Sequence, residues 1–386
     1  MNELLVLLLP LAAFSGWWLA RSDKKTGNEQ KEDDYFKGLS YLLENETDKA
    51  IDIFFRIAHL DDSTIENQIT LGNLFRHRGE IDRALHIHAN LSDKAELTEP
   101  TRQKLNLALA EDYLSAGIMN HAENSFQQVC ASTQPEMRDV ARRKLIHLYA
   151  EQGFWQKALE MIKELDPFGR DPIQQHAAHF YCELAKTALE KGDEETAQDE
   201  LQQALKCDKH CVRATIKLGR LAQSQHRFVT AIGFYNRVEK QNPAFLPEIL
   251  DNVSACYLAL EQADEWKNEL TRLANTYDNP ILVLRLNQLI AEVEGCQAAR
   301  EFLKNQLQQK PNMLSVQAYL KLSDMDNNED IRLLNTSVDK ILAFALKYRC
   351  RDCGFRGNQL NWCCPGCKKW GTFTPVSDIS VKENVQ

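Results

Sequence analysis

The sequence of 386 residues lacks an excess of positive charge and lacks the motifs of the common enzyme classes. It contains 46 Lys and Arg against 55 Asp and Glu, for a formal net charge of −9. This disfavours nucleic acid as the main ligand, because phosphate-binding surfaces are usually basic. No phosphate-binding loop, dinucleotide fingerprint, nucleophile elbow or His-Glu-x-x-His pair occurs. We therefore expect a protein that is not an enzyme and does not bind nucleic acid.

A regular disulfide framework is also missing, although the chain has 11 cysteines. The total is odd, and five of the cysteines cluster between Lys347 and Phe373. The other six are scattered, which is typical of small buried apolar side chains; they are Cys130, Cys182, Cys207, Cys211, Cys256 and Cys296. This usage indicates a reducing compartment.

The N-terminal apolar run, Leu4–Ala20, is not preceded by any Lys or Arg. Its 17 residues would span roughly 26 Å as a helix, which is short but sufficient for a bilayer. A cleaved signal peptide, the alternative, would need basic residues before the run. Here Arg21, Lys24 and Lys25 follow it, and the positive-inside bias places the rest of the chain in the cytoplasm. We predict a transmembrane anchor at residues 1–20 and a polar linker at 21–34.

The body of the chain repeats one pattern. Small residues recur in similar surroundings at steps of 34, 38, 36, 39 and 34 residues. They are Ala50, Ala84, Ala122, Ala158, Ala197 and Ala231, with weaker copies at Trp266 and Ala299. A period near 34 is the tetratricopeptide spacing, in which each copy is a pair of helices, A and B. The prediction is an all-α tetratricopeptide superhelix (an α-solenoid) over residues 35–346, with a concave groove suited to protein segments.

Each copy has the same internal order. Five residues before the small residue comes a turn position suited to a left-handed backbone; it is Asn45, Gly79, Gly117, Gly153, Gly192 or His226. Four residues after it comes a helix B residue expected to fill space beside helix A; it is Phe54, His88, Phe126, Ile162, Leu201 or Tyr235. Helix A carries a Leu-Gly pair in "TLGNLF" and "KLGRLA".

The clustered cysteines have the spacing of a metal knot. Cys350 and Cys353 form C-x2-C before Gly354, and ten residues later Cys364 and Cys367 form C-P-G-C. Two such turns can place four thiolates at the corners of a tetrahedron. Cys363 could replace Cys364 in a C-x3-C pair, but Pro365 favours Cys364 by fixing the turn. We predict a small rubredoxin-like metal-binding ribbon at residues 347–375, followed by a tail at 376–386.

The ribbon is expected to hold one structural metal ion, with Zn favoured over Fe because protein fills all four positions. A redox-active iron site of the rubredoxin type remains an alternative. Aromatic residues Phe355, Trp362 and Trp370 are free to pack, some of them against the repeats. The surrounding basic residues indicate either a solvated rim or a docking face for an acidic protein, phosphate or anionic lipid; they are Lys347, Arg349, Arg351, Arg356, Lys368 and Lys369. An RNA-binding ribbon is the third possibility.

Three further motifs are interpreted as structural. His86 and His88 face apart on a helix, so we expect surface or groove positions rather than a ligand pair. Cys207 and Cys211 lie at a junction between helices and have no partner pair for a second metal site. The "RHR" of Arg76–Arg78 is interpreted as a solvated helix end, with a groove contact to an acidic partner as the alternative.

The combination resembles the bacterial lipopolysaccharide assembly protein B family across essentially the whole chain. The resemblance rests on "ELLVLLLPLAA" (Glu3–Ala13), the text at Ile69–Glu80, "AHFYCELA" (Ala178–Ala185) and "YRCRDCGF…WCCPGC" (Tyr348–Cys367). Cys363 departs from the residue expected before the C-P-x-C pair. The metal knot carries over at Cys350, Cys353, Cys364 and Cys367.

The resemblance implies a non-enzymatic, single-pass adaptor in the inner membrane of Gram-negative bacteria, with its repeats and ribbon on the cytoplasmic side. Such proteins restrain lipopolysaccharide synthesis. They are implied to promote proteolysis of the deacetylase that commits precursor to lipid A, by the membrane-bound AAA+ protease FtsH. Other lipopolysaccharide assembly and transport proteins are implied as further partners.

Overall fold

The computed structural model describes residues 36–38, 40, 41, 46, 49, 53, 65–93, 97–165, 167–323, 329–343 and 345–376. The chain divides into two compact units, Met1–Gly153 and Phe154–Gln386, and each is described by itself. The predicted anchor, the polar linker, most of the first repeat copy and all but Val376 of the predicted tail lie outside the described residues. Among the helices that are described, none has the length and apolarity to cross a membrane.

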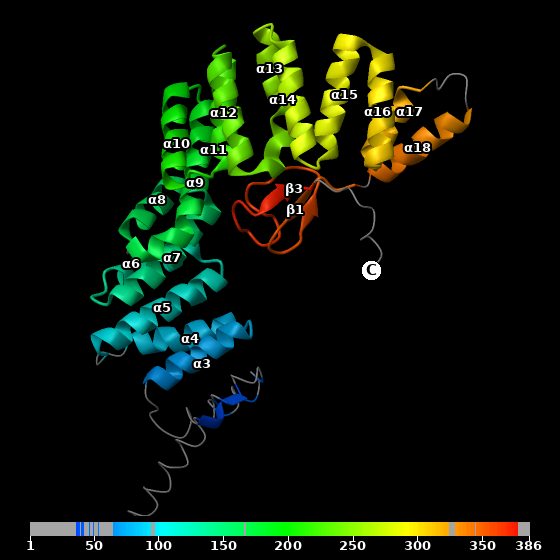
Figure 1. The fold of residues 1–386 in the computed structure, drawn as a ribbon. Helices are drawn as coiled ribbons and strands as arrows, with labels where there is room; N and C mark the ends of the chain where they lie inside the picture. The colour runs from blue at the N-terminus through cyan, green and yellow to red at the C-terminus, as the bar shows by residue number, and fades with distance from the viewer. Residues whose placement is uncertain are drawn as a thin grey trace, which may run out of the picture. The chain divides into compact units, whose positions relative to one another are not determined.

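The described part of the first unit is a succession of helices (Figure 1). They are α3 (Ile65–His77), α4 (Ile81–Ser92), α5 (Glu99–Ser115), α6 (Met119–Cys130) and α7 (Pro135–Gln152). Helices α3 and α4 pack as one pair and α5 and α6 as the next, and α7 packs on α6. The predicted A–B pairing is therefore present, with α3, α5 and α7 as the A helices.

The second unit continues the pattern and ends in a small sheet (Figure 1). Its first helices are α8 (Trp155–Glu164), α9 (Pro167–Glu190), α10 (Glu194–Cys207), α11 (Val212–Ser224) and α12 (Phe228–Gln241). A 3₁₀ turn η1 (Pro243–Glu248) precedes α13 (Leu250–Ala259), α14 (Ala263–Thr276), α15 (Pro280–Glu294), α16 (Cys296–Gln309), α17 (Met313–Lys321) and α18 (Glu329–Ala343). The A–B pairs in contact are α9–α10, α11–α12, α13–α14, α15–α16 and α17–α18.

The repeat pattern corresponds to buried contacts. Every predicted small residue that is described, from Ala84 to Ala231 and at Ala299, is fully buried. Trp266, at the same position in a weaker copy, is 2% exposed and stacks on Tyr257 with ring centroids 5.5 Å apart. The turn positions Gly79 and His226 have φ of +84° and +57°, the left-handed backbone that the sequence predicts. The all-α tetratricopeptide fold is thus confirmed for the described helices.

The Leu-Gly pair of helix A marks a close approach between paired helices. A Cβ on Gly72 would lie 2.3 Å from His88 Nε2, and a Cβ on Gly219 would lie 2.4 Å from Tyr235 Cε1. His88 and Tyr235 are the helix B residues four positions after Ala84 and Ala231, and both are fully buried. The absence of a side chain on the helix A glycine therefore leaves room for the large helix B side chain.

His88 and Arg76 correct the interpretation of two motifs. His86 is exposed, as expected, but His88 is buried, with Nδ1 2.5 Å from Asp112 Oδ2 and Nε2 3.1 Å from the Ile69 carbonyl oxygen. Arg76, expected in solvent, is 9% exposed and donates to Asp112 Oδ1 at 2.7 Å and to Glu111 at 2.6 Å. Both side chains turn inward because Asp112 on α5 is buried between them.

Candidate metal centre

The C-terminal ribbon is a three-stranded antiparallel sheet with strand order β2-β1-β3 (Figure 1). The strands are β1 (Tyr348–Cys350), β2 (Arg356–Gly357) and β3 (Phe373–Pro375). Cys350 ends β1 and lies opposite Phe373 of β3. Phe373 is fully buried, and together with Cys350 and Cys364 it makes the small core of the ribbon. So small a core needs another source of stability, as metal-binding modules do.

The four predicted cysteines come together at one point. Their Sγ atoms all lie within 4.8 Å of one another. Two of the separations are 3.7 Å, from Cys350 to Cys367, and 3.6 Å, from Cys353 to Cys364. Four sulfurs at about 2.3 Å from a central ion would be about 3.8 Å apart in a tetrahedron. The donor set and its spacing therefore fit one thiophilic metal ion.

Two backbone turns present these thiols. The Gly354 N–H donates to the Cys350 carbonyl at 3.1 Å, and the Lys368 N–H donates to the Cys364 carbonyl at 2.9 Å. Gly354 and Lys368 occupy matching positions after the two pairs, with φ of +77° and +59°. A Cβ on Gly366 would lie 3.3 Å from Cys353 Sγ, so a glycine here lets the second turn lie against the first thiol.

The local electrostatics favour unequal ionisation of the thiols. Burial opposes ionisation of Cys350, but the N–H groups of Cys353 and Asp352 and the Thr372 hydroxyl lower its pKa to about 6. The Phe355 N–H favours the Cys353 thiolate, but partial desolvation and the neighbouring thiols outweigh it and raise the pKa of Cys353 to about 11. Four adjacent thiolates repel one another, so a bound cation would be needed to ionise all of them.

Cys363 lies outside the cluster. Its Sγ donates to the Lys368 carbonyl at 3.3 Å, and its backbone bridges to Trp370. Burial raises the pKa of its thiol. The four-residue group found among the described residues therefore contains Cys364 and leaves out Cys363.

Two tryptophans dock the ribbon on the repeats of the second unit. Trp362 stacks on Phe245 of η1 with ring centroids 5.3 Å apart and planes 12° apart. Trp370 stacks on His179 of α9 at 5.3 Å and meets Phe180 edge-on at 5.9 Å. The expectation that Trp362 and Trp370 pack against the repeats is confirmed. Phe355 instead remains 41% exposed and lies beside Phe373.

Buried polar groups lie beneath the two tryptophans. Arg213 of α11 is 5% exposed, lies within 6.0 Å of both indole rings and pairs with Glu183 at 2.6 Å. Burial, Arg213 and His176 lower the pKa of His179 to about 3, so its imidazole is neutral at physiological pH. At another edge the Tyr348 hydroxyl donates to Glu248 at 2.7 Å. The interface combines aromatic stacking with specific polar contacts, which fixes one orientation of the ribbon.

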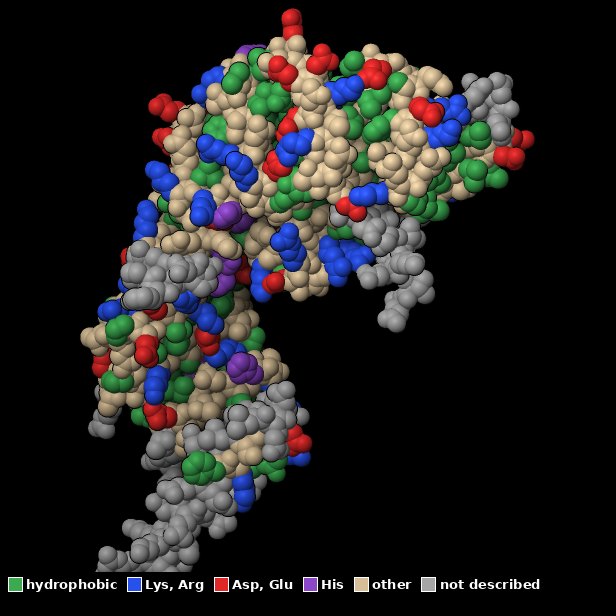
Figure 2. All heavy atoms as spheres, in the orientation of Figure 1, with side chains coloured by type: hydrophobic (Ala, Val, Ile, Leu, Met, Phe, Trp, Pro, Cys, Tyr) green, Lys and Arg blue, Asp and Glu red, His purple; other side chains and the backbone are tan. Residues whose placement is uncertain are grey.

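The exposed surface of the ribbon is basic. Lys347, Arg349, Arg351, Lys368 and Lys369 are exposed, and Arg356 is half-buried. Figure 2 shows Lys and Arg side chains gathered over this surface. Lys369 is paired with Asp352.

The second metal candidate does not assemble among the described residues. Cys207 ends α10 and Cys211 precedes α11, so the pair does lie at the predicted junction between helices. Cys211 instead lies beside Cys182 of α9, and their hydrogen bond lowers the pKa of Cys211. Both Cys182 and Cys211 belong to the apolar core there.

Comparison with known proteins finds matches for the ribbon and for nearly the whole chain. A family model described as a rubredoxin metal binding domain, and named as a zinc ribbon, matches residues 348–375. Lipopolysaccharide assembly protein B of Escherichia coli K12 is 34% identical over 391 residues, covering 98% of this chain and 99% of that protein. The protein of the same name from Haemophilus influenzae is 33% identical over 396 residues, with the same coverage.

Solved tetratricopeptide structures are more distant. The TPR2AB domain of yeast Sti1, in a pHSP90 complex, covers 74% of this chain and 99% of its own, at 14% identity and a TM-score of 0.33. MamA from strain AMB-1 covers 47% of this chain and 93% of its own, at 16% identity and a TM-score of 0.35.

Proposed function

This chain belongs to the lipopolysaccharide assembly protein B family, and on that premise we propose that it is a non-enzymatic adaptor regulating lipopolysaccharide biosynthesis. The observation that carries the proposal is the 34% identity, which extends from the first segment to the metal ribbon over 98% of the chain. A helix-pair array with a docked ribbon suits such a role, because stacked repeats offer a long surface for protein segments.

The adaptor would act by raising local concentration. The apolar N-terminal run would hold the chain at the inner membrane with the repeats in the cytoplasm. The repeats would capture a soluble client, the deacetylase that commits precursor to lipid A, and present it to the membrane-bound protease FtsH. Tethering two partners on one scaffold makes their second encounter nearly intramolecular, which speeds proteolysis without any catalytic group on the adaptor. Other lipopolysaccharide assembly and transport proteins would bind the same scaffold.

We further propose that Cys350, Cys353, Cys364 and Cys367 hold one structural ion, Zn²⁺ in preference to iron. The sulfur spacing suits a tetrahedral tetrathiolate site with no open position for a substrate. When bound, the ion would supply folding energy to the ribbon. The chain's own residues orient the thiols, through the turns at Gly354 and Lys368.

Client turnover in cells tests the adaptor function. In a strain lacking this protein the half-life of the deacetylase should lengthen several-fold, and the wild-type gene should restore it. An unchanged half-life would overturn the proteolysis role. Metal content tests the ribbon separately: colourless protein with one Zn²⁺ per chain is expected, whereas a red protein with reversible reduction would establish the redox-active iron alternative.

A further inference from the structure

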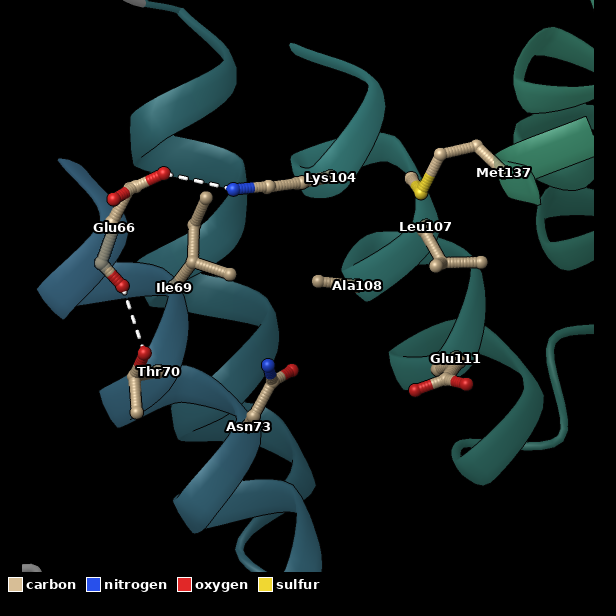
Figure 3. A pocket seen from close by; sticks show the side chains of 9 residues that line it. All are labelled: Glu66, Ile69, Thr70, Asn73, Lys104, Leu107, Ala108, Glu111 and Met137. Atoms are coloured by element: carbon tan, nitrogen blue, oxygen red, sulfur yellow. Dashed lines mark hydrogen bonds and ion pairs between the residues drawn. The ribbon is translucent and has the colours of Figure 1, made fainter. Parts of the chain in front are cut away.

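A pocket of about 370 Å³ opens on the surface of the first unit (Figure 3). All nine lining residues come from the A helices α3, α5 and α7, and none from a B helix. The pocket therefore belongs to the surface along which successive A helices lie, where a segment crossing several repeats would bind. Its volume falls in the range of ligand sites and is too large for a packing defect.

The floor of the pocket is aliphatic. Ile69 and Ala108 are 7% and 4% exposed and form its deepest part, while Leu107 and Met137 are half-buried at its side. In Figure 3 Ile69 and Ala108 face each other between α3 and α5, and Leu107 and Met137 lie next to each other on the α7 side of α5. Such a floor suits an unbranched or γ-branched aliphatic side chain, since the thioether of Met137 adapts its shape.

The charged groups at the pocket are already paired. Glu66 accepts from Lys104 at 2.8 Å across its mouth (Figure 3). Glu111 is bound by Arg76 at 2.6 Å and by Lys144 at 2.7 Å. A charged ligand would have to compete with these pairs, so the pocket selects against an anion or a cation at its centre.

Asn73 is the polar group left without a partner. Its Oδ1 is buried and has no hydrogen-bond partner among the described residues. The side chain projects from α3 into the space between α3 and α5, next to Ile69 and Ala108 (Figure 3). Either orientation of the amide leaves an unsatisfied polar atom at this place, and such atoms are costly to retain. A side-chain amide offers one acceptor and two donors, which match the N–H and C=O of a peptide backbone.

We propose that this pocket binds an extended polypeptide segment, with one aliphatic side chain on the floor and the adjoining backbone amide on Asn73. The inference deepens the proposed adaptor function and rests on it, because it names what the repeats recognise in a client. A lipid acyl chain would fill the floor but leave Asn73 unpaired. A peptide satisfies both features at once.

Peptide display on the purified full-length chain tests the proposal. A random dodecapeptide library would be selected on the wild type and then on Asn73→Ala and Leu107→Trp, the second of which fills the pocket. Asn106→Ala is the matched control, because it removes the same side chain from α5 outside the pocket lining. We expect enriched peptides to share one aliphatic position, to lose about tenfold in affinity on Asn73→Ala, and to bind Asn106→Ala as they bind the wild type.

N-methylation of the selected peptide then identifies the contact. At one backbone amide beside the aliphatic position, N-methylation should weaken binding to the wild type about tenfold and leave binding to Asn73→Ala unchanged. Enriched peptides that bind Asn73→Ala and Leu107→Trp like the wild type would overturn the proposal, as would a selection that enriches nothing. The pocket would instead be assigned to an acyl chain if a fatty acid binds the wild type and Asn73→Ala equally but does not bind Leu107→Trp.

Failure of this site and failure of the adaptor function are separable. Unchanged deacetylase half-life in the deletion strain overturns the adaptor function and says nothing of peptide affinity. Peptide affinity that is unchanged by Asn73→Ala and Leu107→Trp overturns the site. The adaptor function is then tested only by the deacetylase half-life in the deletion strain. Circular dichroism of each variant confirms that the helices remain folded.

Discussion

At the scale of single residues, one buried carboxylate holds three helices of the first unit together. Asp112 of α5 is fully buried, and both its oxygens are used, one by His88 of α4 and one by Arg76 of α3. The network continues through Glu111 to Lys144 of α7. Removing one charged side chain from such a buried network is strongly destabilising, because the remaining charges stay desolvated without their partner.

Replacing Asp112 with Ala should therefore destabilise the first unit by about 3–5 kcal/mol, since it removes one of the two counter-charges of the buried Arg76 and the carboxylate partner of the buried His88. Hydrogen exchange of the α4 and α5 amides in the full chain measures this. Arg83→Ala, which removes an exposed pair with Glu80, is the control and should cost about 1 kcal/mol or less. Equal exchange in the two variants would show that Asp112 contributes no more than a surface charge.

The cysteines give the second residue-scale prediction. The double substitution Cys350→Ser and Cys353→Ser removes two of the four donors, so the purified chain should lose its metal and the ribbon should unfold. Cys363→Ser keeps all four donors and should retain one ion per chain, because Cys363 bonds to a backbone carbonyl outside the cluster. Elemental analysis and the rate of proteolysis of the ribbon measure both effects. A metal-free Cys363→Ser chain would reassign the site.

The sequence predicts a site residue when its partners are close in sequence, and it does not when they lie on other helices. Ligand spacing is local, so Cys350, Cys353, Cys364 and Cys367 could be identified from their own short segment. The repeat predicts that His88 packs beside helix A, but its hydrogen bond joins it to Asp112, which lies 24 positions away on another helix. No periodicity encodes that contact. The sequence does not predict the pocket at Asn73 for the same reason, because its walls come from three helices and its distinguishing feature is an unpaired amide.

At the scale of helices, the repeat depends on how closely A and B approach. Gly219 of α11 faces Tyr235 of α12, where an added Cβ would lie 2.4 Å from the ring. Gly233 of α12 is exposed, and a Cβ there would meet nothing within 4 Å. Both glycines lie inside helices, 14 residues apart in sequence. Gly219 is required by close packing, whereas Gly233 has no packing reason to be glycine.

Alanine at these two positions should therefore act in opposite directions. Gly219→Ala should destabilise the second unit by about 1–3 kcal/mol, because the helices or the Tyr235 ring must shift. Gly233→Ala should stabilise it by about 0.5–1 kcal/mol through helix propensity alone. Thermal unfolding followed by circular dichroism compares them. A destabilising Gly233→Ala would mean that the α12 surface has an unrecognised contact.

The predicted elements hold best in the middle of the array. The helix pairs centred on Ala84, Ala122, Ala197 and Ala231 follow the sequence pattern closely, and the small residue at the centre of each is fully buried. The last pair, α17 and α18, has no counterpart in the sequence pattern, and Val338 is the buried hydrophobic residue of α18. Terminal repeats are free to depart from the pattern because nothing stacks beyond them.

At the scale of the whole molecule, the proposed membrane anchor can be tested by separating its effect on folding from its effect on function. Deleting Met1–Ala20 removes the apolar run but no described helix, so the repeats should keep their helical content. The truncated chain should nevertheless support client turnover poorly, because it loses the local concentration that tethering gives. Circular dichroism and the half-life of the deacetylase measure the two properties. A truncated chain with full activity would show that tethering is dispensable.

The docked ribbon joins the metal to the repeats. Trp362 and Trp370 flank the turn that carries Cys364 and Cys367, and they contact Phe245 and His179. The sequence predicted that some aromatic residues would pack on the repeats, but not on which helices, because the partners lie more than a hundred positions away. The position of each indole depends on a turn that the metal is proposed to hold. Loss of the metal should therefore release the ribbon from α9 and η1.

Hydrogen exchange of α9 and α11 in the full chain measures that release. Removing the metal with a chelator should raise exchange around His179 and Arg213, which the ribbon covers. The double variant Trp362→Ala and Trp370→Ala should raise it to a similar extent while keeping the metal, because the substitutions remove the contacts and leave the thiols. Phe355→Ala changes an exposed aromatic of the same ribbon and should leave exchange in these helices unaltered. If the tryptophan variant and the chelated chain both exchange like the wild type, the repeats hold their shape without the ribbon, and its role lies on its basic exposed surface.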